Sequence, residues 1–305
     1  MNIKNIYKIF FLLVIGICFW RCSSNSFDKD VENMNKGEIV IYADASYTSL
    51  VGELIKSYEN VYPEAKIKAT YASDREILDA FLQNKTQMII TGRELNATEL
   101  AALEKTHKFE PEQFKIATEA IAVITSQNNP DSVFDMNEFI KSRKPGYTGK
   151  YQNTNFVFNK ANGSMINQLI ENEGASLLNM FSLDDKDTLA SYIAANLNTI
   201  GFISFAEISD MDDPTAQAIL EGVKVLSVSK TNAEGIKQVY ELSQSTIATN
   251  SYPLQRSVTV VKGNISQLLG TGFVNFVYRS KASRIILKAG LIPAKMPERE
   301  IKVVE

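Results

Sequence analysis

The fold is decided by the stretch EIVIYADASYT (residues 38–48) and by its continuation SLVGELIKSY (residues 49–58). The first part is an apolar, β-rich run that ends in small polar residues, and the second repeats apolar residues at the spacing of one helix face. Together they predict a strand, a tight loop and a helix N-terminus, with Ser46 or Thr48 as the cap. Unpaired main-chain N–H groups at the positive end of a helix dipole can bind an anion without a catalytic side chain. An ordinary capped helix in an α/β domain is the alternative interpretation of this junction taken alone.

Strands and helices alternate after this junction. We expect strands over 38–43, 66–71 and 87–91, and helices over 47–60, 74–82 and 94–106. Asn96, with Glu99 three residues later, is the expected cap of the last of these helices. Three consecutive strand–helix units predict a parallel sheet with helices on both faces.

The middle of the chain predicts a second lobe. A long apolar strand at 114–125 and the turn cluster SQNNP (126–130) mark the crossover. Beyond it we expect strands over 155–158, 200–205 and 223–228 and a helix over 164–170, then a return strand at 256–261 and closing helices over 270–278 and 281–287. The predicted fold class is therefore α/β with two lobes, 37–125 together with 250–305 and 126–249, each a mixed, mainly parallel sheet with flanking helices. A ligand cleft is expected between the lobes, because strand C-terminal ends and helix N-termini face it.

The N-terminal residues have the pattern of an export signal. Lys4 and Lys8 precede an apolar run at 9–20, which is shorter than the roughly 20 residues that a membrane-spanning helix needs. Cys22 follows this run and is itself followed by polar residues, as in a lipoprotein whose cysteine is acylated after cleavage. We therefore expect a signal peptide at 1–21 and a lipidated polar tether at 22–36, with a retained N-terminal anchor as the alternative.

Charge and cysteine content argue against nucleic acid as a partner and against a disulfide bond. Cleavage before Cys22 leaves 29 basic against 35 acidic residues, a formal charge of −6, with no basic block for nucleic acid. An anionic small ligand remains compatible with this charge, since amides and hydroxyls act at short range and net charge is screened over about 8 Å. Cys22 is then the only cysteine, so no disulfide can form and the core must stabilise the fold.

Three polar loops share the character of an oxyanion site. Each follows a predicted strand and opens a helix, and two contain a glycine that permits close approach of the main chain. The candidate binding residues are Ala45, Ser46, Tyr47 and Thr48 in the first loop, Thr91, Gly92 and Arg93 in the second, and Asn162, Gly163 and Ser164 in the third. Arg93 offers a forked donor to an oxyanion, or alternatively forms a surface salt bridge with Glu94 or Glu99.

The sequence offers little for catalysis or metal binding. His107 is the only histidine, at the expected end of a helix, and the chain has no G-x-S-x-G, P-loop or G-x-G-x-x-G motif. The carboxylate clusters at 184–187 and 210–213 lack the glycine and terminal glutamate of a calcium loop, which favours solvated turns or caps. We expect no enzyme activity, no cofactor and no metal.

Several segments together resemble the substrate-binding proteins of phosphate ABC transporters, in the lipoprotein branch of Bacteroidetes-type bacteria. They are YADASY (42–47), YPEAKI (62–67), TGREL (91–95), AIAVI (120–124), NNP (128–130), YPLQR (252–256) and LKAGLIPAKMPERE (287–300). The resemblance implies a type II periplasmic-binding fold and a monomeric, lipid-anchored receptor that closes over inorganic phosphate or a similar oxyanion and delivers it to an ABC permease.

The same resemblance places the family's three phosphate loops on the three loops named above. Asn159 stands where the family often has an arginine, and the first loop only approximates the usual Gly-Ser-Thr type. Asp44 or Asp74 is the expected acceptor of the ligand proton, which phosphate carries and sulfate lacks at neutral pH. The alternative hypothesis is an envelope interaction or sensory lipoprotein that kept this fold and lost or changed its ligand.

Overall fold

The computed structural model describes residues 33–108, 110–159, 165, 179–184, 186–263 and 268–297. The chain divides into two units, Met1–Glu32 and Asn33–Glu305, and all described residues belong to the second. The predictions for the signal peptide at 1–21, for Cys22 and for the third loop, residues 162–164, lie outside the described residues.

The first lobe is built on the predicted strand–helix units. Strands β1 (Gly37–Asp44), β2 (Ala65–Ala72) and β3 (Met88–Thr91) pair in parallel, as the sequence predicts, and their order in the sheet is β2-β1-β3. They alternate with helices α2 (Thr48–Val61), α3 (Asp74–Leu82) and α4 (Ala97–His107). Asn96 caps α4 by accepting from the main-chain N–H groups of Thr98 and Glu99, so that helix begins three residues later than expected.

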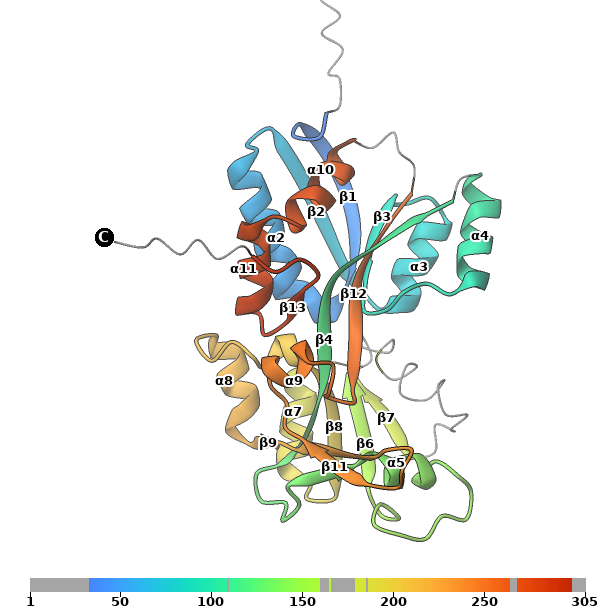
Figure 1. Ribbon diagram of the computed structural model, residues 1–305, viewed down its shortest axis with the longest axis vertical. Helices are drawn as coiled ribbons and strands as arrows, with labels where there is room; N and C mark the ends of the chain where they lie inside the picture. The colour runs from blue at the N-terminus through green and yellow to red at the C-terminus, as the bar shows by residue number, and fades with distance from the viewer. Residues whose placement is uncertain are drawn as a thin grey trace, which may run out of the picture. The chain divides into compact units, whose positions relative to one another are not determined.

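Helices cover both faces of this sheet (Figure 1). Helices α2, α10 (Leu268–Val277) and α11 (Ser280–Lys288) form one apolar layer, which includes Leu54, Phe273 and Ile286. Helices α3 and α4 cover the other face, where Phe81 and Leu103 are buried. The carboxyl ends of β1 and β3 thus reach the same edge of the sheet, where the loops after them meet.

Strand β4 (Glu112–Ser126) belongs to both lobes (Figure 1). Up to Ala120 it pairs with β12 (Gln255–Lys262), and it also pairs with the short β13 (Ile292–Pro293). From Ile121 onward it pairs with β8 (Thr199–Ser204) and then with β9 (Val223–Val225). The change of partner at residues 120 and 121 marks the junction between the lobes.

The second lobe extends the same sheet in the order β4-β8-β6-β7, with β6 (Asn155–Asn159) and β7 (Met180–Leu183). A second sheet has the order β11-β10-β5, and its strands are β11 (Lys237–Tyr240), β10 (Ser227–Thr231) and β5 (Val133–Asp135). The described helices here are α5 (Met136–Ser142), α7 (Lys186–Ala195), the 3₁₀ helix η3 (Phe205–Glu207), α8 (Pro214–Glu221) and α9 (Gln244–Ala248).

The predicted single strand at 223–228 is wrong. It divides at Leu226, because β9 pairs with β4 whereas β10 joins the second sheet.

The segment just before β1 is fixed to the first lobe. Asn33 and Lys36 form an isolated bridge, and the Tyr58 hydroxyl donates to the main-chain oxygen of Met34. Gly272 on α10 lies against the same oxygen and leaves no room for a Cβ. Residues 33–36 of the predicted polar tether therefore pack on the fold. Among the described residues, none of the helices has the length and apolar character needed to cross a membrane.

Candidate functional site

The first predicted loop is a 3₁₀ turn, η1 (Ala45–Tyr47), between β1 and α2. The cap of this turn is Asp44, whose Oδ1 accepts from the Ser46 main-chain N–H at 2.9 Å and from Ser46 Oγ at 2.5 Å. Thr48 Oγ1 donates to the Ala45 oxygen at 2.8 Å, and Tyr47 at the N-cap of α2 makes no side-chain capping bond. The predicted capping by Ser46 or Thr48 is therefore wrong, because the buried carboxylate of Asp44 takes that role one turn earlier.

A buried ion pair lies beneath this loop. Arg256 Nε donates to Glu119 Oε2 at 2.6 Å, and Arg256 Nη2 donates to Ser46 Oγ at 3.0 Å. The Tyr47 hydroxyl donates to the same Glu119 Oε2 at 2.6 Å, and the guanidinium carbon lies 5.1 Å from the centre of the Tyr47 ring. No residue of this group is more than 4% exposed. Neither Glu119 nor Arg256 was predicted as a site residue, although Glu119 is the one charged residue in the apolar run 116–125.

Burial and charge fix the protonation of this group. Burial raises the pKa of Tyr47 well above its ordinary value, so the hydroxyl keeps its proton. Burial lowers the pKa of Arg256, but the charges of Glu119 and Asp44, the nearby Tyr47 and the hydrogen bond to Glu119 together outweigh this effect, and the pKa lies above its ordinary value. The arginine is therefore a permanent cation whose charge is balanced inside the protein.

The second predicted loop meets the first at this arginine. A Cβ on Gly92 would lie 2.5 Å from Arg256 Nη1 and 2.9 Å from the Tyr47 hydroxyl. The close approach that glycine permits here is thus to the guanidinium. Thr91, just before it, is fully buried and donates through Oγ1 to Asp74 Oδ1 at 2.8 Å.

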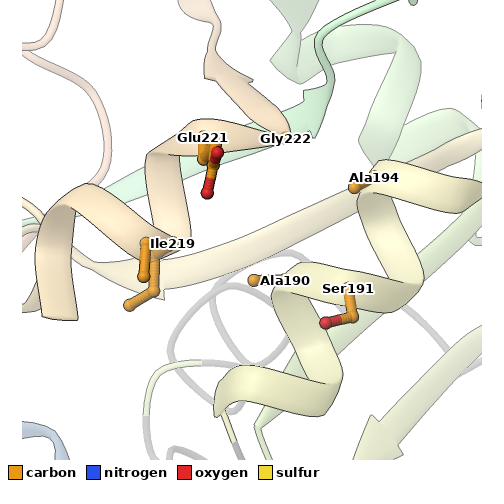
Figure 2. Close-up of a pocket in the computed structure, with 7 residues that line it drawn as sticks. Ala190, Ser191, Ala194, Ile219, Glu221 and Gly222 are labelled. Atoms are coloured by element: carbon orange, nitrogen blue, oxygen red, sulfur yellow. The ribbon is translucent and has the colours of Figure 1, made fainter.

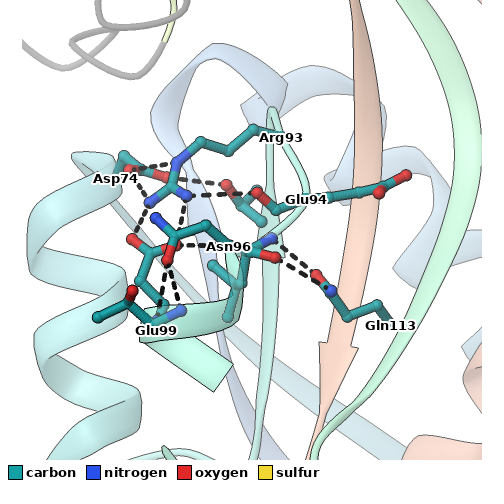
Figure 3. A network of polar contacts seen from close by, with 9 residues as sticks. Asp74, Arg93, Glu94, Asn96, Glu99 and Gln113 are labelled. Carbon is teal, nitrogen blue, oxygen red and sulfur yellow. Dashed lines mark hydrogen bonds and ion pairs between the residues drawn. The ribbon is translucent and has the colours of Figure 1, made fainter. Parts of the chain in front are cut away.

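Arg93 lies between two carboxylates (Figure 3). It donates to Asp74 Oδ2 from Nε at 3.0 Å and from Nη2 at 2.9 Å, and to Glu99 at 2.7 and 2.8 Å. A fifth bond at 3.3 Å reaches the main-chain oxygen of Glu94. Five bonds match the five N–H donors of a guanidinium, so of the two interpretations of Arg93 this conformation shows the salt bridge, with Glu99 and with Asp74.

These bonds also shift proton affinities. The hydrogen bonds that Arg93 donates to Glu99 raise the pKa of Arg93 above its ordinary value. Burial raises the pKa of Glu99, but the hydrogen bond from Arg93 is part of a larger opposing effect, and the pKa is lowered. The two predicted proton acceptors are both engaged within the protein, Asp44 by Ser46 and Asp74 by Thr91 and Arg93.

A cavity of about 330 Å³ opens beside the first loop. One wall comes from the first lobe and the other from the second, and its lining residues are Ala45, Ser46, Thr48, Ser49 and Leu50 on one side and Asn159, Asp184, Ala206, Glu207 and Asp213 on the other. We call this cavity the interlobe cleft. Asn159 ends β6 and stands three residues before the predicted third loop. The cleft therefore presents hydroxyls from the first lobe, and an amide and three carboxylates from the second.

A second cavity, of about 360 Å³, lies between α7 and α8 (Figure 2). Small side chains line most of it, with Ala190 and Ala194 facing Ile219, and only Ser191 and Glu221 add polar side-chain atoms. Convergent polar groups distinguish a ligand site from a packing gap, so we take the interlobe cleft as the candidate site. Within the described ranges, His, Cys, Asp and Glu side chains form no group of three that could hold a metal ion.

Two α/β lobes that share strand β4, with a polar cleft at strand ends and a helix N-terminus, define the class of two-lobed ligand-binding proteins with a type II periplasmic-binding fold. The chain belongs to the PBP superfamily, whose domain model matches residues 29–281. A comparison with curated protein sequences finds no match.

Solved structures share this fold over nearly their whole length. A protein assigned as a phosphate ABC transporter substrate-binding protein from Clostridium perfringens, solved with bound phosphate, has a TM-score of 0.66 at 18% identity, covering 85% of this chain and 100% of that one. An ABC-type phosphate transport receptor from Vibrio cholerae has a TM-score of 0.62 at 15% identity, with coverages of 83% and 99%. PstS from Borrelia burgdorferi gives 0.54 at 16% identity, with coverages of 87% and 100%. At these identities the likeness establishes the fold.

Proposed function

We propose that this protein is a substrate-binding protein that captures inorganic phosphate in the interlobe cleft and delivers it to an ABC permease. The observation that carries the proposal is the cleft itself, where Ser46 and Thr48 at the start of α2 face Asn159 from the other lobe. The start of a helix favours an anion, because its first N–H groups have no partner within the helix and its dipole is positive there. The solved relatives described as phosphate transport proteins support the choice of ligand.

The proposed action is binding without chemistry. The only histidine, His107, ends α4 on the far side of the first-lobe sheet from α2, and the Ser46 hydroxyl is held by Asp44 and Arg256. A group that binds and orients an oxyanion needs no nucleophile–base pair, and the two solved relatives described as phosphate transport proteins support this choice.

The test is a calorimetric titration of the purified chain with inorganic phosphate at pH 7.5, with sulfate as the matched anion. The proposal predicts saturable binding of one phosphate per chain at micromolar concentration, and much weaker binding of sulfate. A chain that is folded by circular dichroism and takes up no phosphate in this range would contradict it.

One observation favours the second hypothesis, a sensory or interaction protein of the same fold with a different ligand. Asp184, Glu207 and Asp213 line the cleft, and no lysine or arginine is among the described residues that do so. Arg93 and Arg256 are both engaged by carboxylates. A ligand carrying an amine or several hydroxyls would suit such walls. Thermal-shift screening of phosphate, sulfate, polyamines and sugars separates the two hypotheses, since only the second predicts a shift with a non-anionic compound and none with phosphate.

We also propose that the chain is exported and held at the membrane by an acylated Cys22. The support is the sequence pattern of a short apolar run followed by cysteine and a polar segment. Replacement of Cys22 by alanine in the full chain should move the protein from the membrane fraction to the soluble fraction of the producing cell. An unchanged membrane fraction would favour a retained N-terminal anchor.

A further inference from the structure

We propose that Glu119 is a positioning residue that holds the two walls of the interlobe cleft at a fixed separation and thereby sets ligand affinity without touching the ligand. This inference rests on the proposed binding function. Its observations are the hydrogen bonds of a single buried carboxylate and the positions along the chain of the groups that donate to it.

Glu119 lies on β4, next to the point where that strand changes partner between the lobes, and its side chain is fully buried. Its Oε2 accepts from the Tyr47 hydroxyl and from Arg256 Nε, each at 2.6 Å. Its Oε1 accepts from the hydroxyl of Ser204. The three donors come from η1, β12 and β8, so one side chain joins elements of both lobes.

Two of these donors lie close in the chain to residues that line the cleft walls. Tyr47 stands between Ser46 and Thr48, which line the first-lobe wall. Ser204 is the N-cap of η3, whose residues Ala206 and Glu207 line the opposite wall. A shift of either wall must therefore move a donor away from the same carboxylate.

The geometry explains why this carboxylate controls position. A charged acceptor in a buried site loses far more from a broken hydrogen bond than an exposed one, because water cannot replace the donor. The ion pair with Arg256, itself bonded to Ser46, adds a third constraint on the first loop. Walls held in the binding geometry before the ligand arrives avoid an ordering cost on binding.

The test uses substitutions that remove one hydrogen bond each and leave the ion pair intact. Tyr47→Phe releases the first-lobe wall, Ser204→Ala releases the second-lobe wall, and the double variant releases both. Tyr151→Phe is the matched control, because it removes a buried tyrosine hydroxyl that accepts from the Asp135 main-chain N–H within the second lobe.

The two readouts are the phosphate Kd by calorimetry and the interlobe distance by spin-label pulsed spectroscopy. The labels go on exposed positions, Lys56→Cys and Lys230→Cys, in a full chain whose Cys18 and Cys22 are replaced by serine.

The inference predicts that each single variant weakens phosphate binding about threefold to tenfold and broadens the interlobe distance distribution. It also predicts that the double variant is little worse than either single variant, since releasing one wall already frees their separation. Tyr151→Phe should lower the melting temperature while leaving the Kd and the distances unchanged. Variants that lower the melting temperature like the control, with wild-type Kd and distances, would overturn the inference, and so would multiplicative effects in the double variant.

The distance measurement keeps this inference separable from the proposed function. If the wild-type chain binds no phosphate, the proposed function fails. Broader distance distributions in Tyr47→Phe and Ser204→Ala, with the control unchanged, would still support the positioning role. Unchanged distributions in that case would overturn it as well.

Discussion

Replacement of Gly92 by alanine tests whether the two loops are joined through Arg256. The added methyl carbon would lie 2.5 Å from Arg256 Nη1, 2.9 Å from the Tyr47 hydroxyl and 3.0 Å from the guanidinium carbon. The guanidinium cannot simply withdraw, because Nε is bonded to Glu119 and Nη2 to Ser46. The substitution must therefore either strain the packing or break a charged hydrogen bond.

The magnitude follows from these two costs. Overpacking of a close-packed core costs about 1–3 kcal/mol, and a lost hydrogen bond to a charged group costs about 1.5–3 kcal/mol. Alanine also restricts the unfolded chain more than glycine does, which raises the free energy of unfolding by about 0.4–1 kcal/mol. We expect Gly92→Ala to lower the free energy of unfolding by about 2–4 kcal/mol and to weaken phosphate binding.

Urea unfolding followed by circular dichroism measures this change, with an unaltered m-value as a check that the same structure unfolds. Gly52→Ala is the matched control. Gly52 lies inside α2, where the nearest atom to a new Cβ is the Tyr71 hydroxyl at 3.7 Å, so alanine should stabilise the helix by about 0.5–1 kcal/mol. A Gly92→Ala chain within about 0.5 kcal/mol of the wild type would contradict the predicted clash with Arg256, and so would equal losses in both variants.

Three further substitutions test separate features. Burial lowers the pKa of Arg143 to about 10, and no described residue accepts a hydrogen bond from its guanidinium, which is only 1% exposed. Arg143→Met should therefore raise the free energy of unfolding by about 1–2 kcal/mol. A lower free energy of unfolding in urea would contradict this. The lowered pKa of Glu99 means that its ion pair with Arg93 stabilises the fold above the ordinary glutamate pKa of about 4.3 and is lost as pH falls further. Glu99→Gln should flatten that acid-side decline in stability, and an unchanged slope between pH 6 and pH 3 would exclude the linkage. Gly272→Ala should push Met34 off α10 and speed tryptic cleavage at residues 33–36, whereas wild-type cleavage would show that the contact is dispensable.

Local patterns predicted the first lobe well. The apolar run of β1 and the one-sided apolar spacing of α2 are properties of consecutive residues, so sequence periodicity shows them directly. The capping box of Asn96 and Glu99 is equally local and was predicted. The parallel pairing of β1 with β2 and β3 was predicted as well, because consecutive strand–helix units form parallel sheets.

The contacts that shape the site join residues far apart in the chain, and they were not predicted from the sequence. Glu119 and Arg256 are 137 residues apart and meet only because β4 and β12 pair in one register. A lone charge within an apolar strand is the signal that could have pointed to Glu119, because a buried carboxylate requires a partner. Leu226 illustrates the same limit, since the division of one apolar run between two sheets depends on which strands lie beside it.

The geometry of the loops also gives new roles to predicted residues. Gly92 makes room for Arg256, and Arg93 joins α3 to α4 through Asp74 and Glu99. Their predicted part in phosphate binding stays a prediction. A phosphate-binding assay on Arg93→Ala would show whether that residue contributes.

Phosphate capture in the interlobe cleft is tested most directly by calorimetric titration of the purified wild-type chain and of Ser46→Ala with inorganic phosphate at pH 7.5. We expect one micromolar site in the wild type and binding weaker by about tenfold or more in the variant, because Ser46 lines the cleft and bonds to Arg256. A folded wild-type chain that binds no phosphate, or a variant that binds it equally well, would contradict phosphate capture in this cleft.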